Sequence, residues 1–108
     1  MLTTTDAGEK ADALARGAVA ARVAACAQIS GPVSSVYRWR GEVVAEREWQ
    51  VLFKTTAARF EALAAHLRAA HGYDTPEIVA TPVTHGDPAY LAWVVEETTP
   101  EPPAPPAA

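Results

Sequence analysis

The stretch that most constrains the fold is VSSVYRWRGEVVAEREWQVLFKT, residues 33–55, where side chains alternate in character along two long arms. Both arms are rich in β-branched and aromatic residues, which favours two half-buried strands. Gly41 lies between them, where a hairpin turn is expected. The arms are long for a chain of 108 residues. Long strands in a small domain often extend past their own sheet, so this pattern predicts a hairpin that pairs with another chain.

Helical periodicity marks three other segments. Residues 7–25 and residues 57–71 carry apolar side chains every three or four positions, as amphipathic helices do. Asp87 and Pro88 have the residue types of an N-cap and a first helical position, so a third helix is expected to begin there. The first of these helices is mostly alanine on its apolar face, which allows it to lie very close to the layer beneath it.

Two shorter segments complete the order of elements. EIVATPV, residues 77–83, has the character of a short apolar strand, and only Leu2–Thr5 remain for a strand before the first helix. The resulting order is the ferredoxin-like β-α-β-β-α-β arrangement. We therefore predict an α+β sandwich of this type with a truncated first strand and an additional C-terminal helix. The first strand is central in this topology, so a four-residue strand is expected to leave its neighbours poorly paired.

The end of the chain has a different composition. Residues 98–108, TTPEPPAPPAA, hold five of the nine prolines and have no helical or strand periodicity. Proline lacks a backbone N–H and fixes φ, so such a segment favours an extended, polyproline-like state. We expect one domain over residues 1–97 and a disordered Pro-rich tail over residues 98–108.

Charge and cysteine content exclude several classes of protein. The net charge is −4 and the pI is near 5.2, whereas a nucleic-acid-binding surface is basic. Cys26 is the only cysteine, so neither an intrachain disulfide nor a cysteine-based zinc motif is possible. The sequence has no signal peptide and no apolar run of roughly 20 residues. We expect a cytoplasmic protein that binds neither nucleic acid nor a membrane.

Catalytic motifs are missing from the sequence. It contains no glycine-rich phosphate loop, no HExxH, no GxSxG and no clear pair of acid–base carboxylates. No motif supplies a base that would activate Cys26 as a nucleophile. The sequence therefore predicts that the chain is not an enzyme.

Four segments together resemble the CutA family of divalent-cation tolerance proteins over about residues 3–95. They are, in order, ARVAACAQISGPVSSVYRWRGEV, VLFKTT, HGYDTPEIVATPV and GDPAYLAWV. The resemblance implies a ferredoxin-like fold assembled as a tight homotrimer, similar to the PII signalling proteins, in which the long hairpin strands cross between subunits. It also implies a link to copper and other divalent cations, with no enzymatic activity.

The resemblance also bears on metal ligands. The copper ligands proposed in some family members, a cysteine and a His-His pair, align with Thr3 and with Ala70 and His71, so one of the three remains. Copper(II) prefers imidazole and thiolate ligands. The candidate metal ligands are therefore His71, His85 and Cys26, with Cu²⁺ as the candidate ion. Each also has a structural alternative: a helix-terminal histidine for His71, a loop residue for His85, and a small buried hydrophobe for Cys26.

A second group of residues points to a cleft between subunits. Lys54 ends the third element of the expected sheet, and Tyr73 and Glu77 border the start of the last strand, so adjacent strand ends are expected to bring a lysine and a carboxylate together. Tyr37 and Trp39 offer a surface on which a ligand can stack, or packing at a subunit interface. A Lys–Glu pair of this kind also has a purely structural interpretation.

The resemblance implies two functions. The first is a homotrimeric divalent-cation tolerance protein that binds metal weakly. The alternative is a trimeric, PII-like signalling or scaffold protein that binds a small ligand at its subunit clefts.

Overall fold

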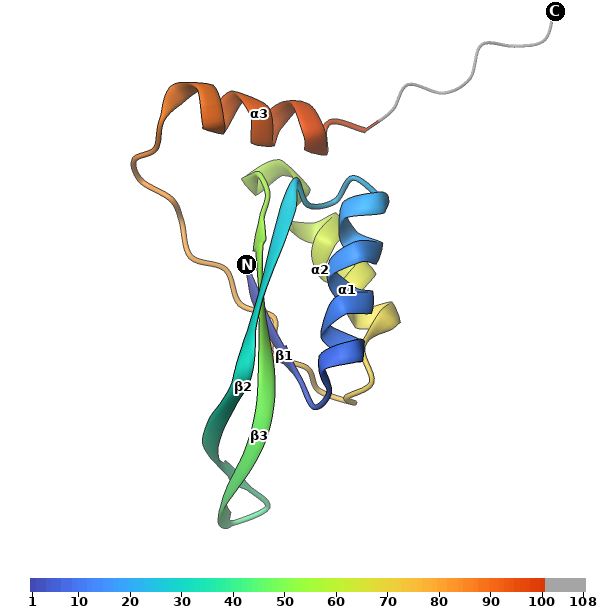
Figure 1. Ribbon diagram of the computed structural model, residues 1–108, viewed down its shortest axis with the longest axis vertical. Helices are drawn as coiled ribbons and strands as arrows, with labels where there is room; N and C mark the ends of the chain where they lie inside the picture. Colours follow the sequence, from blue (N-terminus) through green and yellow to red (C-terminus); the bar gives the residue numbers. More distant parts are fainter. Residues whose placement is uncertain (101–108) are drawn as a thin grey trace, which may run out of the picture.

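The computed structural model of the chain describes residues 1–100. Three strands form one antiparallel sheet, and two helices cover one of its faces, while a third helix lies across one end of the strands (Figure 1). This two-layer arrangement confirms the predicted α+β fold. The elements are β1 (Leu2–Thr5), α1 (Gly8–Ala20), β2 (Cys26–Trp39), β3 (Glu42–Lys54), the short 3₁₀ turn η1 (Ala57–Arg59), α2 (Phe60–Ala70) and α3 (Pro88–Thr98).

The sheet has the order β1-β3-β2, and β1 pairs along its whole length with β3, from Leu2 opposite Leu52 to Thr5 opposite Trp49. On its other side, β1 pairs with Val79 through a single antiparallel bridge, whose two hydrogen bonds measure 2.7 and 3.2 Å. The expected strand over residues 77–83 is therefore present only as this bridge. In this register residues 81–83 lie beyond the end of β1, and Pro76 and Pro82 have no N–H to donate.

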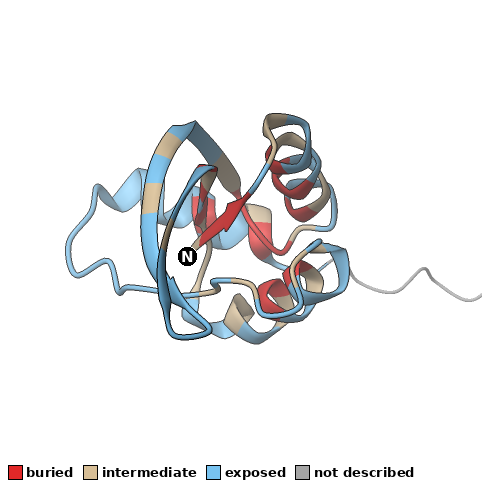
Figure 2. Cartoon of the chain, turned by 90° about the horizontal axis from the view of Figure 1, so that it is seen from below, coloured by how far each residue is buried: buried red, intermediate tan, exposed pale blue. Residues whose placement is uncertain are grey.

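The core lies between the sheet and helices α1 and α2. Alternate strand residues point toward the helices, and Thr3, Thr5, Val51 and Phe53 are each at most 1% exposed. The helices contribute the remaining core side chains: Ala11, Leu14 and Ala18 from α1, and Leu63 and Leu67 from α2. Figure 2 shows buried residues along β1 and on the helix sides that face it, and exposed residues over most of the hairpin. One complete hydrophobic core therefore exists on the helix side only.

The β2–β3 hairpin forms as the sequence predicts. Arg40 and Gly41 occupy the turn with φ of 50° and 82°, and Trp39 pairs with Glu42 across it. Two residues with positive φ are what a tight hairpin of this hand requires, and glycine adopts that conformation without steric cost. The predicted break at Ser30-Gly31-Pro32 is a register shift within β2 rather than the end of an element.

The first helix is shorter than predicted. It ends at Ala20, and Arg22, with φ of 60°, turns the chain toward β2. Cys26 consequently opens β2 instead of ending the helix. The helix ends here because tertiary contacts replace helical hydrogen bonds. The Arg59 guanidinium donates to the carbonyl of Arg22 at 3.5 Å, and the Thr55 hydroxyl donates to the carbonyl of Val23 at 2.8 Å.

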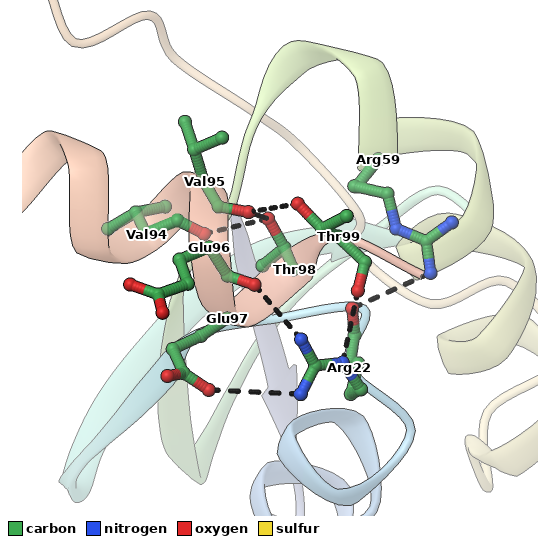
Figure 3. A network of polar contacts seen from close by, with 8 residues as sticks. All are labelled: Arg22, Arg59, Val94, Val95, Glu96, Glu97, Thr98 and Thr99. Atoms are coloured by element: carbon green, nitrogen blue, oxygen red, sulfur yellow. Dashed lines mark hydrogen bonds and ion pairs between the residues drawn. The ribbon is translucent and has the colours of Figure 1, made fainter. Parts of the chain in front are cut away.

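Helix α3 begins at Pro88, with the Asp87 carboxylate accepting a hydrogen bond from the Tyr90 N–H at 3.2 Å. Its other end is held by Arg22, which donates to the carbonyls of Glu96 and Thr99 at 2.9 and 3.0 Å (Figure 3). Cations favour the C-terminal ends of helices because the last carbonyls lack helical partners. Arg22 therefore fixes α3 to the body of the molecule.

The expected Pro-rich tail begins at Thr98, which the structure places as the fully buried last residue of α3. Residues 101–108 of that tail lie outside the described residues. Between residues 1 and 100, no helix has the length and apolar character needed to cross a membrane.

Candidate functional site

A cavity of about 590 Å³ lies on the face of the sheet that the helices leave open. β1, the two arms of the hairpin and the loop after α2 each contribute to its wall. Its polar and aromatic lining residues are Tyr37, Trp39, Glu48, Gln50, Tyr73, Asp74 and Glu77. The volume falls within the range of about 300–1,000 Å³ that is usual for small-molecule sites. The cavity therefore has room for a small organic ligand.

Four of the five residues expected in a cleft line this cavity together: Tyr37, Trp39, Tyr73 and Glu77. Lys54 does not. It lies six positions along β3 from Glu48, which is roughly 20 Å in a strand, and its Nζ donates to Gln28 Oε1 at 3.2 Å. The expected Lys54–Glu77 pair is therefore absent from the described chain, because Lys54 lies next to Met1 at the opposite end of β3.

Glu48, Gln50 and Asp74 line the cavity although the sequence analysis did not select them, and Glu48 is the most deeply buried of the three. Its position on β3 has the same parity as Gln50, which turns both side chains toward the open face. Glu48 is only 7% exposed, and it accepts a hydrogen bond from the Tyr73 hydroxyl at 2.9 Å. The alternation of side chains along the strand predicts which way Glu48 points. Its burial could not be predicted, because charged residues in exposed strands are usually solvent-accessible.

Burial and the contact with Glu48 both favour the protonated form of Tyr73. Burial, followed by the hydrogen bond to the Glu48 carboxylate, raises the pKa of Tyr73 well above its ordinary value. The phenol consequently keeps its proton and remains the donor. The pair therefore places a phenol donor and a glutamate acceptor side by side in the wall of the cavity.

His71 positions this pair rather than facing a ligand. It caps α2, its Nε2 donates to the carbonyl of Thr4 at 2.7 Å, and its Nδ1 accepts from the Tyr73 N–H at 3.0 Å. Those two partners fix the neutral tautomer with the hydrogen on Nε2. Both ring nitrogens are therefore used within the chain, and they tie the Tyr73 loop to β1.

The other two candidate metal ligands lie apart from His71. Cys26 Sγ lies 3.5 Å from the Tyr90 hydroxyl, at the α3 end of β2. His85 is exposed in the loop before α3, where its Nδ1 lies 3.0 Å from Thr84 Oγ1. Among residues 1–100, no three His, Cys, Asp or Glu side chains are grouped closely enough to hold a metal ion. One copy of the chain does not bring its candidate ligands together.

Large apolar side chains are exposed on the hairpin, in the segment after α2 and on α3. They are Ile29, Val36, Val43, Leu52, Val79, Val83, Leu91, Trp93 and Val95, each at least 39% exposed. Monomeric proteins seldom expose so much apolar surface, and such surfaces mark sites of association. The hairpin beyond residue 33 also pairs only with itself, so both of its outer edges keep free backbone groups.

Comparison with known proteins gives one consistent match. The model of the family described as CutA1 divalent ion tolerance protein matches residues 1–97. The divalent-cation tolerance protein CutA of Thermus thermophilus is 42% identical over 91% of this chain and 95% of its own length. The corresponding protein of Escherichia coli O139:H28 is 39% identical over 87% of this chain and 84% of its own.

Solved structures agree with the sequence matches. The Thermus thermophilus structure superposes with a TM-score of 0.88 at 42% identity, covering 91% of this chain and 95% of that one. CutA1 from Oryza sativa superposes with a TM-score of 0.88 at 34% identity, covering 91% of this chain and 90% of that one. Every element of the cavity wall lies within residues 1–97, the range that the family model matches.

Proposed function

Because the chain belongs to the CutA1 divalent ion tolerance family, we propose that it protects cells against divalent cations as a homotrimer that binds its ligand without transforming it. The match of the family model over residues 1–97 carries this proposal. The chemistry of the described residues supports a binding protein: the one cysteine contacts a tyrosine hydroxyl rather than a base.

The homotrimer is supported by what one chain leaves uncovered. The exposed apolar residues of the open face and the free edges of the hairpin are the two features that a second copy would bury and pair. A symmetric closed assembly satisfies both without leaving an edge for further growth. Each subunit would then place its hairpin against its neighbour.

Copper(II) is the ion we propose, with ligands drawn from more than one copy. A protein site for copper needs two or three converging ligands. Residues 1–100 of one copy contain no group of three side chains that could hold a metal ion. His85 is the histidine best placed to contribute, because it is exposed and only its Nδ1 contacts a neighbour. Cys26 is a soft donor, and His71 is proposed to support the loop and to bind metal only if its contacts to Thr4 and Tyr73 are given up.

The tolerance function is tested by complementation. An Escherichia coli strain that lacks its own CutA is expected to regain growth in copper(II) when it expresses this chain. Calorimetry of purified trimer with copper(II) is expected to show binding that falls in His85→Ala and is unchanged in His66→Ala, a histidine that is not a candidate ligand. Failure of growth to recover for copper(II), zinc(II), nickel(II) and cobalt(II) would contradict the function.

A cytoplasmic location is also our proposal. The relative from Archaeoglobus fulgidus is described as a periplasmic divalent cation tolerance protein, so members of the family are not described uniformly. Fractionation of cells with an antibody to the untagged chain tests this, and recovery in the periplasmic fraction contradicts it.

A second candidate function is the binding of a small ligand at a cleft, as in trimeric PII-like signalling or scaffold proteins. The cavity favours it, because four residues distant in sequence line one space of small-molecule size. Loss of binding of every small-molecule class to the purified trimer would remove this candidate and leave the tolerance function in place.

A further inference from the structure

The most unusual group on the open face is the Glu48 carboxylate. It is more than nine-tenths buried, and no ion pair links it to a lysine, arginine or histidine among residues 1–100. Its recorded hydrogen-bond partner is the neutral Tyr73 hydroxyl, which binds only Oε2. A buried carboxylate without a cation is costly, since it gives up hydration without regaining it from an opposite charge. Within residues 1–100 of one copy, the Glu48 side chain therefore lacks a cationic partner.

The cavity that Glu48 lines has the same sign throughout. Asp74 and Glu77 add two more carboxylates to its wall, and none of the lining residues is basic. An anionic ligand would meet three carboxylates and no donor charge. The wall therefore selects for a positively charged occupant.

Aromatic side chains define what kind of cation fits. Tyr37, Trp39 and Tyr73 line the same space as the carboxylates. The faces of such rings attract ammonium and guanidinium groups, and the Arg40 guanidinium lies 5.5 Å from the centroid of the Trp39 ring in this chain. A hard cation such as Ca²⁺ or Mg²⁺ would instead need about six or more converging oxygens, and the carboxylates of residues 1–100 are not grouped in that way. Size, charge and aromatic walls together favour an organic cation.

We propose that this cavity binds a small organic cation with one or more ammonium groups, which pairs with Glu48 and lies against Trp39. The proposal rests on the second candidate function, a ligand cleft, and names the class of its ligand. Glu48 receives one ammonium group at Oε1, Glu77 and Asp74 attract the charge at the rim, and Tyr73 holds the Glu48 carboxylate in place through Oε2.

Three four-carbon probes that differ mainly in charge test the proposal by calorimetry on the full chain. They are 1,4-diaminobutane, 1,4-butanediol and succinate. The diamine is expected to bind at least about tenfold more tightly than the diol, because a charge-assisted hydrogen bond lowers the dissociation constant by about tenfold or more. Succinate is expected not to bind. Equal binding of the diol or tighter binding of succinate would overturn the organic cation and keep the cleft.

Variants identify the site. Glu48→Gln keeps an acceptor for Tyr73 and removes the charge, so it is expected to weaken the diamine about tenfold or more and leave the diol unchanged. Glu77→Gln changes an exposed residue of the cavity rim and is expected to weaken binding of the diamine about threefold. Glu61→Gln, on the opposite side of the sheet, is the control and is expected to bind like the wild type. Unchanged affinity in both cavity variants overturns the site.

A basic residue of a second copy is the competing occupant. If such a residue neutralises Glu48 in the trimer, the wild-type protein will bind none of the three probes, and this outcome contradicts the organic cation. Copper(II) complementation is measured independently, so the tolerance function keeps its own test.

Discussion

The two faces of the sheet are built from the same strands but differ in how far their side chains are buried. Val51 and Phe53 point toward the helices and are at most 1% exposed, whereas Leu52, between them, points the other way and is 41% exposed. A strand alternates its side chains between two faces, so neighbouring residues with equal apolar character meet different surroundings. The helix side is complete within one chain, whereas the open side leaves apolar side chains such as Leu52 uncovered beside a polar cavity.

The difference teaches which part of the sequence serves folding and which serves association. Alanine-rich α1 and α2 lie close to the sheet and finish the core of a single chain. The open face instead carries the cavity and the exposed Leu52, and the hairpin edges beyond residue 33 lack partners within the chain. The predictions that follow separate the two faces.

The largest expected effect is on the helix side. Phe53→Ala removes a ring that is 1% exposed and is expected to lower the free energy of unfolding by about 3–5 kcal/mol. Denaturant unfolding monitored by circular dichroism measures it. Phe53→Leu is the control, since it keeps most of the apolar volume and is expected to cost less than about 1.5 kcal/mol. Similar small losses for both variants would mean that the helix side is not the core.

Leu52→Asp tests the open side. It places a charge where the account expects a subunit interface, and burial of an unpaired carboxylate costs several kcal/mol, so the trimer is expected to dissociate. Sedimentation measures the mass, and helical circular dichroism is expected to be kept because Val51 and Phe53 are untouched. Leu52→Met retains the apolar contact and is expected to remain a trimer. An associated Leu52→Asp variant would contradict the interface.

Tyr73→Phe tests the cavity on the open face through pH. The pKa of Tyr73 is raised by burial and by Glu48, so the stability it contributes is complete below its ordinary value of 10.0 and is lost as the pH rises above that value. The wild type is therefore expected to lose stability above pH 10, and the variant is expected to lose less. Melting temperatures from pH 8 to 11 measure this, and parallel curves would contradict the Tyr73–Glu48 contact.

Arg22→Gln tests how α3 is held beside the open face. Loss of the charged donor to Glu96 and Thr99 is expected to lower the local opening free energy of α3 by about 1–2 kcal/mol and to leave β3 unchanged. Amide hydrogen exchange reads both elements in one experiment. Arg16→Gln, which breaks only an exposed pair with Asp12, is the control and is expected to change neither. Faster exchange throughout the chain would contradict a local role.

Local patterns predicted the elements that depend on neighbours in sequence. The alternation around Gly41 gave the hairpin, and the Asp87-Pro88 pair gave the start of α3, because turn geometry and helix capping act over a few residues. The strand expected at residues 77–83 is a single bridge because its pairing depends on how far β1 extends. The early end of α1 depends on contacts made by Arg59 and Thr55.

The candidate site was predictable only in part for the same reason. Tyr37, Trp39, Tyr73 and Glu77 were found because they stand out in their segments, and the fold brings them to one cavity. Glu48 is held by Tyr73, which lies 25 positions away in the sequence. One of the two hydrogen bonds of the His71 ring goes to Thr4, which lies 67 positions away. No local pattern reports such contacts, and strand register separates Lys54 from the site.

The mass of the wild-type protein in solution is the most direct test of whether other copies cover the open face. Sedimentation equilibrium of the untagged chain at micromolar concentration is expected to give the mass of three 11.4 kDa chains. A single species with the mass of one chain would contradict the claim that association covers the open face.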